Sequence, residues 1–487
     1  MPRLLLFLVT LLLSVAAIAD PPAPAAPLAK TAAVDERVEL LMIVARLAGN
    51  DEYNMPNSAS PYAKRVAAHF GPYKDHKAIS SFQAMRRDRG ASYDAVPSLA
   101  LHLDGVPSLQ PRMPFEPRPL QLDARWDPAR TAAFLEDLRA FAVDSNARAY
   151  FDQERGFYDA VEARLAAFAA KADAVAWFDR FFGVRQSASY VVIPGLLAGG
   201  GNFGMSVTFP ETDANRRPEE IRPVLGCWTW DSEGLPVFAV ETYLPTYVHE
   251  LCHAYTNRIV DAHKDVLEPP ANRIYPAVAR RMQRMAYANG LTMMYESIVR
   301  ACVVRFLLER DGKDAARKEA EAQAAAGFVW VPGLAELLGT YEKDRATYPT
   351  FDAFVPEIAR FFNDKAVAMV DEIARKEKDA AEKAPRLLGM TPENGAVDVD
   401  AALDAMVLRF DQPMRDGSWS FVGSKENLPE FVGQPSYDAT RRILTVKVKL
   451  RRGATYTFYL NSDRFKSFTS ADGYPLAPVR VTFTVRK

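Results

Sequence analysis

The pattern of apolar and polar residues divides the chain into a long, mainly helical part and a shorter part built of strands. Apolar residues recur with helical spacing in several segments. These predicted helices cover residues 38–43, 131–143, 157–168, 248–259, 291–306, 315–326 and 351–382. Four short apolar runs separated by turn residues predict a small, mostly antiparallel sheet before the fourth helix: residues 190–193, 203–209, 224–230 and 237–240. Helices around a short sheet indicate an α+β fold for residues 34–383.

From Pro385 to Lys487 the apolar residues alternate with Thr, Lys and Arg. Four runs place apolar side chains on one face: residues 406–410, 444–450, 456–460 and 479–485. This period of two predicts a β-sandwich, and the segment has roughly the length of one Ig-like domain. The Cys and Trp residues typical of antibody domains are missing from the pattern. Modules of this kind position or tether a protein, so residues 385–487 are the candidate for contact with the cell envelope.

The first 33 residues have the features of an export signal and a linker. Met1-Pro2-Arg3 precedes the apolar run 4–18, and the run ends in small residues, which is typical of a signal peptide cleaved after Ala19. The run is too short for a stable membrane span, and no other segment is long and apolar enough. Residues 20–33, rich in Pro and Ala, predict a flexible linker. We therefore expect a secreted or periplasmic protein.

Charge and cysteine content narrow the class of protein further. Lys and Arg together number 60 against 61 Asp and Glu, a formal charge of -1, so we expect no nucleic-acid partner. The three cysteines, Cys227, Cys252 and Cys302, are too few for a disulfide framework. Cys252 lies on an apolar helical stripe and is expected in the core, not on a metal. A bridge between Cys252 and Cys302 is the open alternative.

The segment with the clearest chemistry is an H-E-x-x-H motif formed by His249, Glu250 and His253. Four-residue spacing places both imidazoles on one helix face, one turn apart, where they can share a zinc ion. Glu250 is then directed at the water that completes the metal's coordination and is the candidate general base. The alternative is a chance pair on a structural helix. Of the other histidines, His76 and His102 are expected to be surface or capping residues.

A catalytic zinc site needs a third protein ligand and an open fourth position. Glu296 is the best candidate, because it lies in the run 291–306, which is apolar nearly all round. An ionised carboxylate in such a helix needs a compensating charge. Asp261 is the next candidate, although eight residues of continuous helix carry it about 12 Å beyond the motif. Arg300, four residues after Glu296, either forms a plain ion pair with it or supports it as a metal ligand.

Other polar residues are candidates for supporting roles beside the metal. Asn257, one turn beyond the motif, either supports the site or faces solvent. A donor for the oxyanion of the tetrahedral intermediate is also needed, and Tyr295, Tyr341 and Tyr348 are candidates by chemistry alone.

The glycine-rich run 199–204 joins two predicted strands and opens no helix, so it is not a nucleotide cradle. A flexible hairpin is its first interpretation. The functional alternative is that this run and the strand from Phe203 wall the site, where a substrate peptide adds as an extra strand.

These motifs resemble a known family. Residues 249–257 (HELCHAYTN) and 295–301 (YESIVRA) resemble the H-E-x-x-H-x-x-x-N and E-x-x-x-R-A pattern of a bacterial domain-of-unknown-function family. That family is regarded as secreted zinc metallopeptidases, and several members carry an Ig-like module after the peptidase region. The resemblance covers about residues 35–380 and implies a zincin-like, gluzincin-like domain with zinc held by His249, His253 and Glu296. Residues 391–399 (TPENGAVDV) and 410–414 (FDQPM) are similar to the bacterial Ig-like domain of surface-layer proteins.

Taken together, these patterns predict an exported zinc metallopeptidase that acts on polypeptides, with Glu250 moving a proton from water to the leaving amine. The competing hypothesis is a non-catalytic, zinc-containing binding protein of the cell surface. Glu250 argues against it, because a structural zinc is normally closed by a fourth ligand and needs no glutamate there. A zinc hydrolase of non-peptide amides is the third reading.

Overall fold

The structure is a computed structural model that describes residues 31–55, 60–182, 188–210, 219–462 and 464–487. The predicted signal peptide, residues 1–19, and the predicted linker as far as residue 30 lie outside the described residues. The end of the linker, Thr31–Ala32, forms strand β1. Two compact units make up the chain. One takes the described residues up to Asn272 together with Arg281–Phe362, and the other takes Arg273–Arg280 and the described residues from Asn363 onward.

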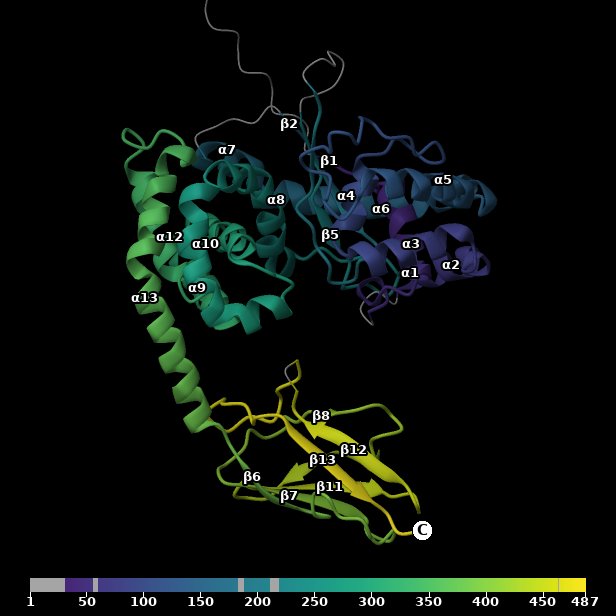
Figure 1. The fold of residues 1–487 in the computed structure, drawn as a ribbon, viewed down its shortest axis with the longest axis vertical. Helices are drawn as coiled ribbons and strands as arrows, with labels where there is room; N and C mark the ends of the chain where they lie inside the picture. Colours follow the sequence, from purple (N-terminus) through teal and green to yellow (C-terminus); the bar gives the residue numbers. More distant parts are fainter. Residues whose placement is uncertain (1–30, 56–59, 183–187, 211–218, 463) are drawn as a thin grey trace, which may run out of the picture. The chain divides into compact units, whose positions relative to one another are not determined.

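Helices form most of the first unit, and the predicted helical segments all lie inside observed helices (Figure 1). The helices are α1 (Glu36–Leu47), α2 (Pro61–Phe70), α3 (Lys77–Arg89), α4 (Ala95–Leu101), α5 (Pro128–Asp144), α6 (Ala147–Ala172), α7 (Ala174–Phe182), α8 (Val240–Ala262), α9 (Lys264–Arg284), α10 (Gly290–Asp311), α11 (Lys313–Ala326), α12 (Val331–Lys343) and α13 (Phe351–Lys383), with short 3₁₀ helices at Asp51–Tyr53 and Gly71–Tyr73. Helices α9 and α13 continue into the second unit. No helix among the described residues is both long and apolar enough to cross a bilayer.

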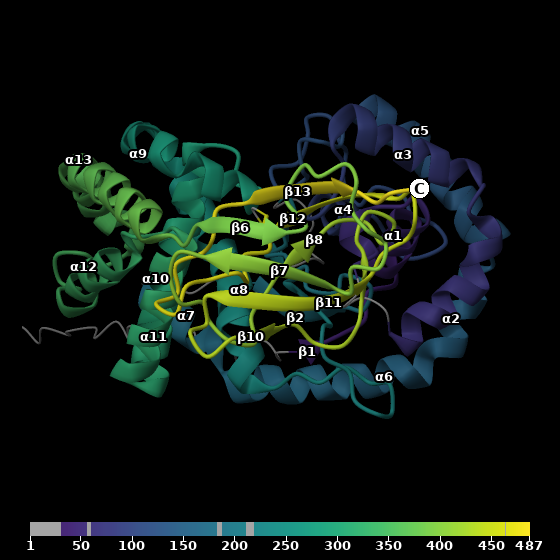
Figure 2. The same cartoon turned by 90° about the horizontal axis from the view of Figure 1, so that it is seen from below.

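A small sheet lies between helices α1–α6 and helices α7, α8 and α10–α12 of the first unit (Figures 1 and 2). Its central strand is β2 (Ala188–Gly195), which runs parallel to β1, β4 (Glu219–Ile221) and β5 (Val224–Gly226). Only β3 (Ser206–Thr208) is antiparallel to its partner, β4, and it forms an edge of the sheet. The combination of many helices with a small sheet is confirmed, but the prediction of a mostly antiparallel sheet is wrong.

The error has a physical reason. Side chains point alternately to the two faces in parallel and antiparallel strands alike, so this period of two does not give the direction of a strand. Strands β2 and β3 are consecutive but do not pair, because β4 lies between them. The glycine-rich run 199–204 is therefore not a hairpin. Residues 237–240 are not a strand either, since α8 already begins at Val240.

The apolar stripe of α8 packs into the core as the sequence predicts. Val248 and Cys252 are 0% exposed, Leu251 is 1% exposed and Tyr255 is 2% exposed. Helix α10 packs beside α8, and most of its side chains between Met293 and Leu307 are buried. Asn289 caps the start of α10 by accepting a hydrogen bond of 2.8 Å from the backbone N–H of Thr292. These two helices therefore form a fixed support for the side chains between them.

The carboxyl group of Glu39 is buried in this unit and forms no ion pair with the described residues. Glu39 is 0% exposed, and its oxygens accept hydrogen bonds from the Tyr62 hydroxyl at 2.9 Å and the Leu196 backbone N–H at 3.3 Å. Burial raises the pKa of Glu39 to about 8, the hydrogen bonds from Tyr62 and Leu196 offset part of the rise, and the charge of Asp35 adds to it. Glu39 is therefore protonated in the folded protein at neutral pH.

This buried acid makes a prediction for stability. The unfolded chain, with an ordinary pKa of 4.5 at Glu39, loses the proton first, so the free energy of unfolding falls as pH rises from about 4.5 to about 8. The expected slope is on the order of 1 kcal/mol per pH unit. Glu39→Gln, which keeps a neutral side chain of the same shape, should remove this slope in denaturant titrations across that range. The exposed Glu136→Gln is the control. Equal pH slopes for wild type and Glu39→Gln would contradict the assignment.

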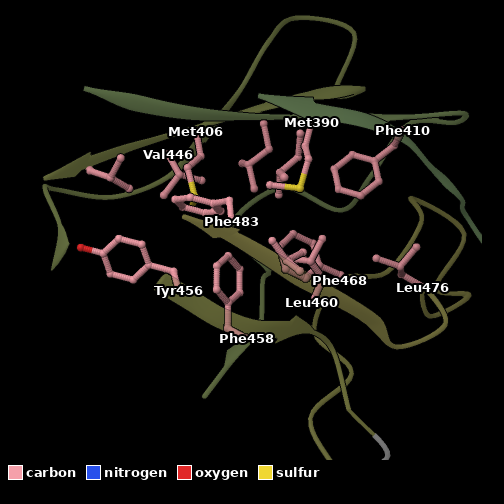
Figure 3. Close-up of a cluster of buried hydrophobic side chains, with 14 of the residues drawn as sticks. Met390, Met406, Phe410, Val446, Tyr456, Phe458, Leu460, Phe468, Leu476 and Phe483 are labelled. Carbon is pink, nitrogen blue, oxygen red and sulfur yellow. The ribbon is translucent and has the colours of Figure 1, made fainter. Parts of the chain in front are cut away.

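The second unit ends in a sandwich of two antiparallel sheets, as the period-two pattern predicts. One sheet has the order β10-β11-β7-β6, with β9 also on β11, and the other has the order β13-β12-β8. The strands are β6 (Leu387–Thr391), β7 (Ala405–Phe410), β8 (Phe421–Val422), β9 (Glu430–Phe431), β10 (Ser436–Tyr437), β11 (Ile443–Lys449), β12 (Thr455–Leu460) and β13 (Val479–Thr484). Met406, Phe410, Phe458 and Phe483 meet in its core (Figure 3).

Candidate metal centre

Helices α8 and α10 bring three predicted ligands together. The Nε2 atoms of His249 and His253 lie 3.3 Å apart. Glu296 of α10 places Oε2 3.4 Å from Nε2 of His249 and Oε1 3.5 Å from Nε2 of His253. The side chains of His249, His253 and Glu296 are 16%, 13% and 9% exposed, so the group is only partly buried. Two imidazoles and a carboxylate that converge in this way can hold a metal ion.

The protonation states of these groups suit metal binding. Burial lowers the pKa of His249 to about 4, although the neighbouring Glu296 opposes the shift, so the imidazole is neutral at neutral pH. Burial alone raises the pKa of Glu296, but interactions with His249, His253 and Arg300 outweigh it and hold the pKa well below its ordinary value. A neutral imidazole and an ionised carboxylate are the forms that bind metals.

Asn257 lies one turn beyond His253 and touches it. Its Oδ1 atom is 3.0 Å from Nδ1 of His253, and an amide oxygen can only accept, so Nδ1 carries the proton. The lone pair of Nε2 then faces Glu296 and His249. Asn257 thus selects the tautomer of His253 that can act as a ligand.

Glu250 lies close to both histidines of this group. It is 8% exposed, and one of its carboxylate oxygens lies within 4.8 Å of the ligand atoms of both histidines. Burial raises its pKa well above the ordinary value, and the charge of Glu296 adds to the rise, while Arg300 and a hydrogen bond from the Gly204 backbone oppose it. A basic carboxylate of this kind is a candidate for proton transfer.

Gly204 brings the end of the glycine-rich run against α8. A Cβ atom at this position would lie 2.6 Å from the Glu250 carbonyl oxygen and 2.7 Å from Cβ of His253, so only glycine fits. Its backbone N–H donates to the Glu250 carboxylate. Gly204 therefore lies against the motif helix, the position expected from the functional interpretation of the run 199–204.

Arg300 contacts this group of residues through Glu296. Its Nη2 atom lies 3.1 Å from Oε2 of Glu296 and donates at 3.0 Å to the hydroxyl of Tyr287. Its Nη1 atom donates to Gln323, and its guanidinium lies 4.4 Å from the ring centre of Phe328. Arg300 thus contacts Glu296 as expected. Tyr287 belongs to no recognisable motif, so the sequence does not predict its place here.

The remaining candidates lie elsewhere. Asp261, the second choice for the third ligand, accepts a hydrogen bond from Tyr295 instead. That contact occupies the Tyr295 hydroxyl, while Tyr341 donates to the backbone oxygen of Phe181. The Tyr348 hydroxyl bonds Glu357. The described contacts of these three tyrosines do not include the motif residues.

The other histidines and the cysteines play structural parts. His76 caps α3, because its Nδ1 atom accepts from the Ala78 backbone at 3.1 Å, and His102 is buried at the end of α4. Cys227, Cys252 and Cys302 are free and fully buried, so the core role predicted for Cys252 is confirmed. The thiols of Cys252 and Cys302 are neighbours across α8 and α10, without a disulfide.

Comparison with known proteins gives two family matches. Residues 120–361 match the family described as a domain of unknown function, DUF4932, and this range contains all residues of the candidate metal centre. Residues 381–485 match the family of bacterial Ig-like domains. No curated protein matches the chain.

Among solved structures, CopC from Methylosinus trichosporium OB3b is 24% identical, with 21% of this chain and 93% of that chain covered at a TM-score of 0.17. The S-layer protein SbsC is 16% identical, with 54% of this chain and 36% of that chain covered at a TM-score of 0.16. The family matches show that the chain combines a DUF4932 region with a C-terminal bacterial Ig-like domain.

Proposed function

We propose that the protein is an exported, zinc-dependent peptidase with a zincin-like domain of the gluzincin type. The observation that carries the proposal is the convergence of His249, His253 and Glu296 at separations of 3.3, 3.4 and 3.5 Å. Export rests on the signal peptide expected from the first 19 residues.

The donor set fits zinc in size and chemistry. With Zn–N and Zn–O distances of about 2.0–2.1 Å, ligand atoms at the corners of a tetrahedron lie roughly 3.3–3.4 Å apart. The two imidazole nitrogens lie 3.3 Å apart, and each lies 3.4 or 3.5 Å from a different oxygen of Glu296, so the donor atoms are spaced on this scale. Imidazole and carboxylate donors are also ligands that zinc accepts. Because these side chains are partly exposed, we expect water to reach the metal as a fourth ligand, as a catalytic zinc site requires.

The reaction follows from the roles of the side chains. Zinc, when bound, would acidify water and polarise the scissile carbonyl. Glu250 accepts the proton of the attacking water and then delivers it to the leaving amine. The Gly204 N–H holds the Glu250 carboxylate in place. Asn257 keeps His253 in the required tautomer, and Arg300 holds Glu296.

The sheet edge favours a polypeptide substrate. The backbone groups of Phe203 and Met205 bond the neighbouring strand, so those of Gly204 and Ser206 point away from it by alternation. This outward edge starts directly beside Glu250. A peptide backbone added here as an antiparallel strand would bring its amide bonds past the candidate metal centre.

Cleavage of a diverse peptide library, read by mass spectrometry, tests the proposal. The zinc-loaded protein should cut a subset of peptides, the chelator-treated protein should not, and added zinc should restore cleavage. Cleavage that survives full removal of zinc would exclude the proposed chemistry. Intact peptides at full zinc occupancy would favour the cell-surface binding protein.

A further inference from the structure

Tyr287, in the connection between α9 and α10, has its hydroxyl inside the polar network of the metal centre. Ala286, with φ of 67°, turns the chain just before it. The Tyr287 hydroxyl accepts from Nη2 of Arg300 at 3.0 Å and is hydrogen-bonded to the Glu296 carboxylate. A guanidinium can only donate and an ionised carboxylate can only accept, so the phenol oxygen accepts from Arg300 and the phenol O–H donates to Glu296.

The surroundings of Tyr287 restrict its movement. Its ring packs edge-on against Phe328, with ring centres 6.1 Å apart, and Phe328 is 0% exposed. The guanidinium of Arg300 lies against both rings, at 4.4 Å from the centre of Phe328 and 5.9 Å from that of Tyr287. Two donors, from a loop and from α10, therefore reach the same carboxylate from fixed positions.

We propose that Tyr287 is a positioning residue, which acts together with Arg300 to fix the Glu296 carboxylate in the orientation that binds the metal. The inference rests on the proposed function, because it concerns the same zinc site. The terminal torsion of a glutamate has a broad rotational preference, so α10 alone does not set the direction of the carboxylate oxygens. The hydrogen bonds from Tyr287 and Arg300 set the direction of these oxygens. The loss of such partners of a metal ligand typically weakens metal binding by about 10–100-fold.

The test is Tyr287→Phe, which removes one hydroxyl and keeps the ring against Phe328. Tyr295→Phe is the matched control, because it removes a hydroxyl that bonds Asp261 and does not reach the metal centre. The zinc dissociation constant is measured by competition with a chromophoric chelator. The visible spectrum of the cobalt-loaded protein reports the arrangement of the ligands. We expect about 10–100-fold weaker zinc binding and an altered cobalt spectrum for Tyr287→Phe, with neither change in the control.

A second variant, Arg300→Lys, separates positioning from a general loss of stability. If both residues act on one carboxylate, the losses of zinc affinity in Tyr287→Phe, Arg300→Lys and the double variant are not additive. Wild-type affinity and spectrum in Tyr287→Phe, or strictly additive losses, would overturn the inference while leaving the zinc site intact. A wild-type protein that binds neither zinc nor cobalt would overturn the proposed function itself.

Discussion

Glu250→Gln is expected to lower peptide turnover by on the order of 100-fold or more, with zinc content and melting temperature close to those of wild type. The amide is nearly the same size as the carboxylate and can still interact with the Gly204 N–H, but it cannot accept a proton from water. Glu250 lies close to His249 and His253 but is not one of the three proposed ligands, which are His249, His253 and Glu296. Zinc analysis, thermal melting and peptide cleavage on the same preparations check the three expectations.

Glu241→Gln provides the control for this change, because Glu241 lies in the exposed first turn of the same helix. It should cleave at the wild-type rate. Undiminished cleavage by Glu250→Gln would mean that another base acts or that a contaminating peptidase is present. Lost zinc in Glu250→Gln would instead place Glu250 among the ligands.

Glu296→Ala is expected to lose most of the bound zinc, because two imidazoles remain and the carboxylate that completes the set is gone. The variant also leaves Arg300 without its carboxylate partner, so some loss of stability should accompany the loss of metal. Metal analysis after dialysis measures the first effect, and thermal melting of the metal-free proteins measures the second.

Asp261→Asn tests the alternative ligand under the same conditions. Since Asp261 accepts from Tyr295, this variant should keep its zinc. The reverse result, full zinc in Glu296→Ala and none in Asp261→Asn, would transfer the third position to Asp261 and remove the basis for the proposed site.

Helices and the sandwich could be predicted from the sequence because their apolar periodicity reports directly which face is buried. The stripe that contains Val248 and Leu251 is an example, since both residues are in the core. The order of strands β1 to β5 could not be predicted, because it depends on which strands become neighbours after the chain crosses the sheet. A pattern along one strand holds no information about its partner.

In the candidate site too, some residues could be predicted from the sequence and others depend on tertiary packing. His249, Glu250 and His253 share one helix turn, so their spacing predicts their proximity, and the burial of Glu296 marks it as unusual. Tyr287 and Gly204 reach the site through tertiary packing, and neither stands at a recognisable spacing from the motif. Tyr295, Tyr341 and Tyr348 were candidates by chemistry alone, and their hydroxyls bond residues outside the motif. A phenol can donate to a metal centre only if the fold brings it there.

Gly204 also governs how the sheet and the motif helix can move. At Gly204, two residues before β3, only hydrogen occupies the place of a Cβ atom next to the Glu250 backbone and the His253 side chain. A shift of the strand toward α8 would therefore press directly on the two residues that matter most to the chemistry. Rigidity at this point comes from the missing side chain, because the glycine backbone meets the Glu250 backbone and the His253 side chain directly.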